Sequence, residues 1–477
     1  MVFQSITYLI FLSALLAVYY WLPRRPQNAL LVIASCIFYG WIHPWYLILI
    51  GITALFDWGC ALGMDASADQ GRRKRFLILS LSVNFAVLGT YKYFGFFAEN
   101  VTALLTTAGL MPSPWLVHLA LPAGISFFTF QSASYALDVY WKKVPACRSL
   151  LDYATFVTFF PQLVAGPIER AGHMLPQYAQ PRRVTLEAAR SGLVLLLWGL
   201  LQKVVIADNC AIISQKVFSL GDASFPLVWG GVIAFGVQIY ADFSGYTDMA
   251  RGTARLLGVE LCPNFNHPFL AQSPNDFWRR WHISLSTWFR DYVYIPLGGS
   301  RGGPGMLQRN LFITFLLSGL WHGASWNFLI WGAYHGLLVI LWPMAAPSLT
   351  WLHGKGGFVG RGLRILLTYV LIHLGWLMFR ETNLPMLIRH LSLNPLAAPM
   401  AEWRMGAAFA LEAALYGLPL ICLLPFLERK GLIPGKDNSC FHTWRWTVLQ
   451  GACAALLLVV IVLYRSRTGS DFIYFQF

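Results

Sequence analysis

Long apolar stretches separated by short polar ones set the pattern of this 477-residue chain. Apolar runs of about 20 residues are long enough to cross a bilayer as helices. We therefore predict an all-α polytopic membrane protein with about eleven transmembrane helices, forming one membrane domain over 1–477 with an aromatic tail over 465–477. The predicted spans lie near 3–22, 28–43, 45–63, 76–97, 115–141, 191–213, 226–246, 310–344 (with a break), 362–379, 405–426 and 446–464.

Basic residues between the spans suggest an orientation. Arg24-Arg25, the run at 72–75 (RRKR) and Lys142-Lys143 each follow a predicted span. Loops rich in Lys and Arg stay on the cytoplasmic side. This rule places the first residues outside and all three clusters inside, which agrees with the number of spans between them. The first span is not preceded by positive charge, so we expect a retained helix and not a cleaved signal.

Two segments depart from the spanning pattern. The apolar run 150–170 is interrupted by Pro161, Gly166 and Pro167, which indicates a re-entrant or broken helix lining a cavity. The run 260–309 mixes arginines with aromatic residues, a composition typical of an interfacial helix at the cytoplasmic surface.

Composition narrows the class of protein. Apolar residues make up 57% of the chain and charged residues 12%, about half the charged share of soluble domains. The net charge of +14 lies in short loop clusters, so we predict contact with membrane lipid and no nucleic-acid partner. The eight cysteines include no CxxC pair. We expect no disulfide, no metal site and no bound cofactor.

His322 lies near the middle of an uncharged stretch, Asn310 to Met344. Placing His322 there is costly, and the residue either packs by hydrogen bonding between helices or serves a function. A buried imidazole can take a proton during acyl transfer. His282, in the polar segment, can position a substrate or donate to an oxyanion. Arg279, Arg280 and Arg301 suit the phosphate groups of a cytoplasmic donor.

Polar residues also recur within the predicted span 226–246. Asp242 and Asp248 are six positions apart and would face different directions on one helix. Asp242 either caps the following segment or contributes to a site. If Asp242 and His322 relayed protons, the chain would instead be a proton-coupled transporter. A transporter predicts inverted-repeat symmetry, which the sequence does not show.

Three segments together resemble the membrane-bound O-acyltransferase family. They are 276–288 (DFWRRWHISLSTW), 290–292 (RDY) and 318–323 (SGLWHG). Within the family, the resemblance is to the bacterial branch for alginate O-acetylation and teichoic-acid D-alanyl transfer, which 238–250 (QIYADFSGYTDMA) and the first residues, MVF, match as well. The resemblance covers nearly the whole chain.

The resemblance implies a helical fold with a central tunnel, in which His322 is catalytic and His282 is a second active-site residue. We assign Arg279, Arg280, Arg301, Trp281 and Asp242 to donor or substrate binding. Acetyl-CoA is the implied donor, an exopolysaccharide of the alginate or cellulose type is the acceptor, and a periplasmic SGNH-type acetyltransferase is the partner. The implied location is the bacterial inner membrane. Transfer to peptidoglycan, lipid or protein stays an alternative.

The end of the chain adds one hypothesis. Its last residues, FIYFQF, resemble the end of the small partner protein of the D-alanyl family member. The resemblance implies that Tyr474 can carry an acyl group on the outer face. The alternative is an aromatic tail that rests in the membrane interface. Arg465 and Arg467 fit an outside tail poorly.

Overall fold

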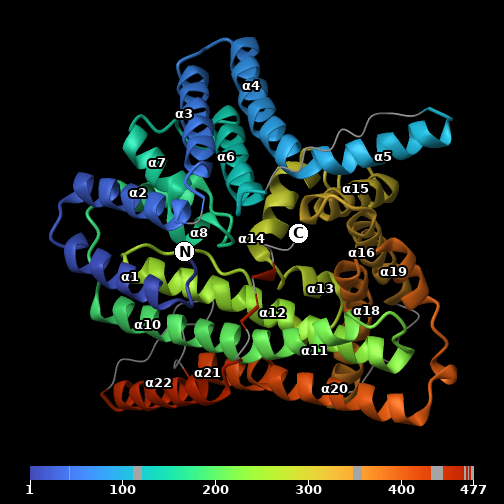
Figure 1. The fold of residues 1–477 in the computed structure, drawn as a ribbon. Coiled ribbons are helices and arrows are strands. Elements are labelled where there is room, and N and C mark those ends of the chain that lie inside the picture. The colour runs from blue at the N-terminus through green and yellow to red at the C-terminus, as the bar shows by residue number, and fades with distance from the viewer. Residues whose placement is uncertain are drawn as a thin grey trace. The chain divides into compact units, whose positions relative to one another are not determined.

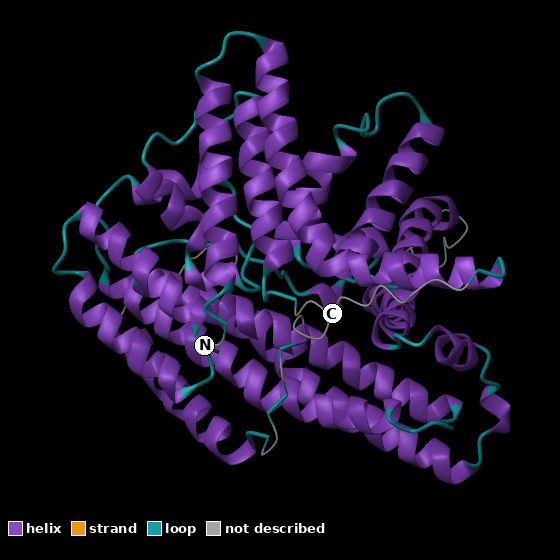
Figure 2. Ribbon diagram, turned by 45° about the horizontal axis from the view of Figure 1, so that its top comes forward, coloured by secondary structure: helices purple, strands orange, loops and turns teal. Residues whose placement is uncertain are grey.

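The computed structural model describes residues 1–41, 43–110, 121–346, 357–430, 444–466, 469–470 and 472–473. Every regular element in these ranges is a helix (Figure 2). Within these described ranges, seven helices are long and apolar enough to cross a membrane, at Tyr46–Asp65, Gln70–Thr107, Leu186–Phe218, Phe225–Leu256, Trp326–Ala345, Val359–Arg380 and Met400–Arg429. The all-α polytopic prediction is therefore confirmed. In their described parts, the predicted spans near 28–43 and 115–141 contain shorter helices, of 17 and 16 residues, while 42 and 115–120 lie outside the described residues.

The helices group into two compact units, which are described separately, and a single membrane domain stays a prediction. The first unit is Met1–Thr185 with Leu256–Leu261. Its elements are α1 (Ile6–Tyr19), α2 (Arg24–Gly40), α3 (Tyr46–Asp65), α4 (Gln70–Leu88), the π-helical turn η1 (Gly89–Tyr93), α5 (Phe94–Thr107), α6 (Ile125–Tyr140), α7 (Leu150–Thr158), α8 (Phe160–Leu163) and α9 (Ala171–Tyr178) (Figure 1).

Polar side chains tie the helices of this first unit together. Asp57 on α3 is fully buried and accepts hydrogen bonds from Ser80 (2.6 Å) and Asn84 (2.8 Å) on α4. Arg73, within the basic run, is also buried, and it donates to the Met64 carbonyl (2.6 Å) and the Val139 carbonyl (2.9 Å). An arginine at the carboxyl ends of α3 and α6 satisfies carbonyls that the helices leave open.

The predicted break within 150–170 is confirmed. α7 ends at Thr158, and Phe159 adopts a non-helical backbone before the short helix α8 begins at Phe160. Pro161 lies in the first turn of α8, where its missing N–H costs no hydrogen bond.

The second unit is Leu186–Arg255 with Cys262–Phe477. Its elements are α10 (Leu186–Leu201), η2 (Gln202–Ala207), α11 (Asp208–Phe218), α12 (Phe225–Leu256), η3 (Pro268–Leu270), α13 (Pro274–Trp278), α14 (Ile283–Phe289), η4 (Arg290–Tyr294), α15 (Pro304–His322), α16 (Trp326–Ala345), α18 (Gly357–Arg380), α19 (Leu384–Leu391), η6 (Pro395–Ala397), α20 (Met400–Leu418), η7 (Pro419–Leu423), α21 (Leu424–Arg429) and α22 (Trp444–Tyr464). η2, η4 and η7 are π-helical, while η3 and η6 are 3₁₀ helices.

Two helical boundaries in this unit bear on the predictions from the sequence. The uncharged stretch divides into α15 and α16, as its length suggested, and His322 is the last residue of α15. α12 runs unbroken to Leu256, beyond the predicted end at 246. Asp242 therefore lies inside a helix, so the capping alternative is wrong.

Glycine allows α15 and α16 to approach closely. A Cβ on Gly319 would lie 2.2 Å from the Phe328 carbonyl oxygen and 3.1 Å from the Cα of Gly332. Small residues at such crossings let backbones meet in a membrane. This contact sets where α15 ends relative to α16, and therefore where His322 lies.

Candidate active site

His322 lies in a buried aromatic cluster where α15 ends. Its side chain is 5% exposed, and its ring centroid is 4.9 Å from Trp321, 5.0 Å from Trp331 and 5.3 Å from Phe379. The helix ends there because Gly323 adopts an extended backbone, φ −162° and ψ 153°. A side chain at 323 would collide with the Phe328 ring, 2.0 Å from the built Cβ. The glycine thus allows the chain to turn while the ring packs against it.

A polar row leads along α15 to this histidine. Asn310, Thr314, Ser318 and His322 recur every fourth residue and are all buried. Residues four apart lie on one helix face. Because the other residues of α15 after Arg309 are apolar or glycine, this row marks a polar path that ends at the imidazole.

A cavity of about 410 Å³ adjoins the same face of α15, which is within the usual size of ligand pockets. Its wall is largely apolar, with hydroxyls from Ser286, Thr287, Thr314 and Ser318 and two arginines, Arg279 and Arg290. The remaining lining residues are Asn275, Trp278, Ile283, Leu285, Phe289, Tyr294, Leu311, Phe315 and Val339. Since Ser318 is one turn before His322, the cavity lies within a helical turn of the histidine along α15.

His282 lies between α13 and α14 with a left-handed backbone, φ 42°. Asn264 fixes this bend, because its carbonyl accepts from the Ile283 N–H (2.9 Å) and its side-chain oxygen accepts from the Ser284 hydroxyl (2.6 Å). The His282 side chain is 1% exposed. Burial lowers the pKa of His282 to about 3 from its ordinary 6.5, so the ring is neutral at physiological pH.

One tryptophan links the two histidines. The Trp321 centroid is 6.1 Å from that of His282 and 4.9 Å from that of His322. On its other side, His282 meets Phe243 of α12 edge-on at 4.6 Å. The sequence placed these histidines in separate motifs, and the structure brings them to one aromatic cluster.

The other predicted donor-binding residues are dispersed. Arg279 is exposed and lines the cavity. Arg280 pairs with Asp276 (2.8 Å) one turn earlier. Trp281 is 1% exposed and stacks on Phe277 at 5.4 Å, in the core. Arg301 is exposed in the glycine-rich turn that precedes α15. Only Arg279 of these four lines the cavity.

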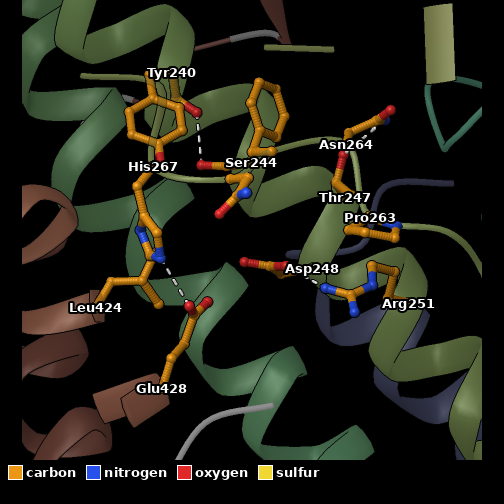
Figure 3. Close-up of a pocket in the computed structure, with 12 residues that line it drawn as sticks. Tyr240, Ser244, Thr247, Asp248, Arg251, Pro263, Asn264, His267, Leu424 and Glu428 are labelled. Carbon is orange, nitrogen blue, oxygen red and sulfur yellow. Dashed lines mark hydrogen bonds and ion pairs between the residues drawn. The ribbon is translucent and has the colours of Figure 1, made fainter. Parts of the chain in front are cut away.

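A second, smaller cavity is lined by residues of α12, of the loop 263–267 and of α21 (Figure 3). Its wall is polar: His267 contacts Glu428 at 2.8 Å, and Asp248 contacts Arg251 at 3.5 Å. Asn264 belongs to the same wall. This polar layer supports the loop that holds His282.

Asp242 contacts the end of the chain. Its Oδ1 lies 3.0 Å from Nζ of Lys203, and its Oδ2 accepts from the Ile473 N–H at 2.7 Å. Tyr474, the next residue, lies outside the described residues, as does Arg467. Sequence reasoning did not single out Lys203. A lysine within the apolar span 191–213 was nevertheless a signal, because ionisable residues at membrane depth are costly.

Comparison with known proteins gives the family. The model of the membrane-bound O-acyltransferase family matches residues 145–345, which contain both histidines. A Pseudomonas putida protein named "Probable alginate O-acetylase AlgI" is 36% identical over 500 residues, covering 100% of both chains. The chain belongs to the membrane-bound O-acyltransferase family. The resemblance seen in the motifs is confirmed, and the protein is an acyltransferase.

Two further family members frame the choice of acceptor. The Pseudomonas aeruginosa "Probable alginate O-acetylase AlgI" is 40% identical over 390 residues, covering 80% of this chain and 73% of the relative. A Helicobacter pylori "Peptidoglycan O-acetyltransferase" is 32% identical over 487 residues, covering 94% and 91%. The first name describes O-acetylation of alginate, and the second describes O-acetylation of peptidoglycan.

Proposed function

We propose that this acyltransferase takes acetyl groups from acetyl-CoA in the cytoplasm and passes them across the bacterial inner membrane. The final acceptor is an exopolysaccharide of the alginate or cellulose type. The alginate O-acetylase names of the Pseudomonas relatives support this acceptor. The observation that carries the proposal is the buried polar row of α15, which runs beside the 410 Å³ cavity and ends at His322.

His322 serves as the general base in this proposal. The acceptor hydroxyl oxygen attacks the thioester carbonyl carbon while the unprotonated imidazole takes the hydroxyl proton. The carbon–sulfur bond breaks, and the imidazolium returns that proton to the thiolate. An ester and a free thiol result. His282, which is neutral, keeps one ring N–H to donate to the oxyanion that forms during the attack.

The donor occupies the cavity. Its acyl end lies beside Thr314 and Ser318, while Arg279 and Arg290 meet its phosphates at the exposed rim. Arginine suits this role because its guanidinium donates several hydrogen bonds to phosphate oxygens. Arg301 is a further exposed cation in the turn before α15. Arg280 and Trp281 act indirectly, by holding the segment that carries His282.

Tyr474 is the proposed first acceptor. Its phenol would receive the acetyl group as an ester and pass it to a periplasmic SGNH-type acetyltransferase, which modifies the polysaccharide. The tail residues just before it, Phe472 and Ile473, are buried within the second unit. Tyr474→Phe keeps the ring and removes the hydroxyl. Polysaccharide acetylation should fall to background in this variant, and full acetylation would rule out the carrier role.

The function is tested by His322→Gln in cells that make the polymer. His335→Gln is a matched control, because His335 is also buried and its ring also contacts Trp331. The ring centroid of Trp331 lies 4.8 Å from that of His335 and 5.0 Å from that of His322. We expect loss of acetyl groups from the secreted polymer in the first variant only, with equal protein in the membrane. Normal acetylation with His322→Gln would contradict the assignment.

Peptidoglycan is the second candidate acceptor, favoured by the Helicobacter pylori relative that covers nearly the whole chain. The same cells separate the two acceptors. Acetyl groups that disappear from peptidoglycan and not from the exopolysaccharide in His322→Gln would select this alternative.

A further inference from the structure

Three charged side chains form a buried cluster within the second unit. Lys203 is 2% exposed, and its Nζ lies 2.9 Å from Oδ1 of Asp208 and 3.0 Å from Oδ1 of Asp242. Lys203 belongs to the π-helical turn η2, between α10 and α11. Single π turns inside α-helices often mark functional sites. Burying such a cluster is expensive and often does not stabilise a fold, so its retention calls for another reason.

Tail atoms complete the cluster. Nζ of Lys203 donates to the Ser470 carbonyl at 2.8 Å, and the Ser470 hydroxyl donates to Asp208 at 2.6 Å. The Ile473 N–H donates to Asp242 at 2.7 Å. The ammonium group of Lys203 has three N–H donors, whereas the two carboxylates it faces offer more acceptor sites than that. The tail supplies further N–H and O–H donors to these carboxylates.

Most of these bonds involve backbone atoms of the tail. The residues that precede the tail are held in the same way. The Ser466 N–H donates to the Val204 carbonyl (3.0 Å), and the Asn209 side chain donates to the Tyr464 carbonyl (3.1 Å). Hydrogen bonds to backbone atoms fix which tail residue lies opposite each residue of the helices, whatever the tail side chains are. The register of the tail is therefore set by η2, α11 and α12.

Apolar contacts then orient the tail toward the histidines. Phe472 is 6% exposed, and its ring lies 4.9 Å from Tyr246 and 6.2 Å from Phe243. Phe243 follows Asp242 in α12 and contacts His282 at 4.6 Å. One aromatic ring thus separates the held tail from the second active-site histidine.

We propose that Lys203, Asp208 and Asp242 form a peptide-binding socket, which holds the tail through Ser470 and the backbone N–H of Ile473. In the proposed function, this binding serves to present Tyr474. These three are positioning residues. The consequence for Tyr474 rests on the proposed function, whereas the binding of the tail does not.

Hydrogen exchange of the full-length protein in nanodiscs tests the socket. In Asp242→Asn and Lys203→Met, amides of the peptide that contains 470–473 should exchange at least tenfold faster than in the unchanged protein, while those of α12 keep their protection. Asp57→Asn is the control: it alters an equally buried aspartate in the first unit and should leave tail exchange unchanged. Unchanged tail exchange in both socket variants would overturn the proposal.

A variant on the tail side covers the case in which a socket variant fails to fold. Ile473→Pro removes the N–H that Asp242 accepts and leaves every socket charge in place. The remaining tail amides should again exchange at least tenfold faster, and unchanged exchange contradicts the socket. Acetylation is measured in parallel. A released tail with normal acetylation supports the socket and overturns the carrier role of Tyr474.

Discussion

Gly323→Ala is predicted to slow acyl transfer by about 100-fold without changing any polar group of the site. The new Cβ would lie 2.0 Å from Cε2 and 2.2 Å from Cδ2 of Phe328, whereas carbon atoms in contact stay about 3.5 Å apart. The ring therefore has to retreat by about 1.5 Å. Because Phe328 lies 4.9 Å from Phe379, and Phe379 lies 5.3 Å from His322, the displacement reaches the imidazole through one ring.

The same substitution should lower the free energy of unfolding by about 1–3 kcal/mol, as overpacking of a core commonly does. The backbone itself is not strained, because Gly323 is extended. The assay is acetyl transfer by the purified protein, with thermal unfolding measured in the same preparation. Gly51→Ala is the control, since no atom lies within 4 Å of its Cβ.

A second substitution can relieve the clash. Phe328→Leu removes the ring edge that the new Cβ meets. If the ring is the cause, the double variant with Gly323→Ala should transfer acyl groups about tenfold faster than Gly323→Ala alone. Full activity of Gly323→Ala alone would refute the reasoning, and so would a double variant no better than the single one.

Two other predictions concern the cavity and the second histidine. Ser318→Phe should fill part of the 410 Å³ cavity and lower kcat/KM for acetyl-CoA by about 10²-fold or more, while Ser318→Ala changes it little; equal effects of the two would contradict donor binding there. The pKa of His282 is lowered to about 3, so the unfolded chain binds more protons between about pH 6.5 and 3, and stability falls as the pH drops through this window. His282→Gln should reduce that loss in acid unfolding measurements, and an unchanged pH dependence would argue against a buried neutral ring.

Local patterns in the sequence predicted the parts of the fold that depend on neighbouring residues. Pro161 marked the break between α7 and α8, and the length of the uncharged stretch marked the division into α15 and α16. The motifs at 276–288, 290–292 and 318–323 together resemble the family that the comparisons show. Each of these signals lies within a few helical turns of the feature that it predicts.

Features that depend on distant pairing could not be predicted in this way. Lys203 and Ser470 are 267 positions apart, and no periodicity relates them. Trp281 was assigned to substrate binding from its motif, yet its side chain stacks in the core, because a sequence does not show which way a residue in an irregular segment points. The sequence marks Asp242 as an ionisable residue near an apolar span, but its bond to Ile473 depends on where the tail lies.

Single-turnover transfer in proteoliposomes tests the central claim, that the acetyl group changes hands at His322, most directly. Radiolabelled acetyl-CoA is supplied on the cytoplasmic face, and the label is followed onto protein or acceptor on the other face. We predict that His322→Gln lowers the transfer rate by about 10²- to 10⁴-fold, the usual contribution of a general base, while His335→Gln stays close to the unchanged protein. Transfer by His322→Gln at the unchanged rate would contradict the account.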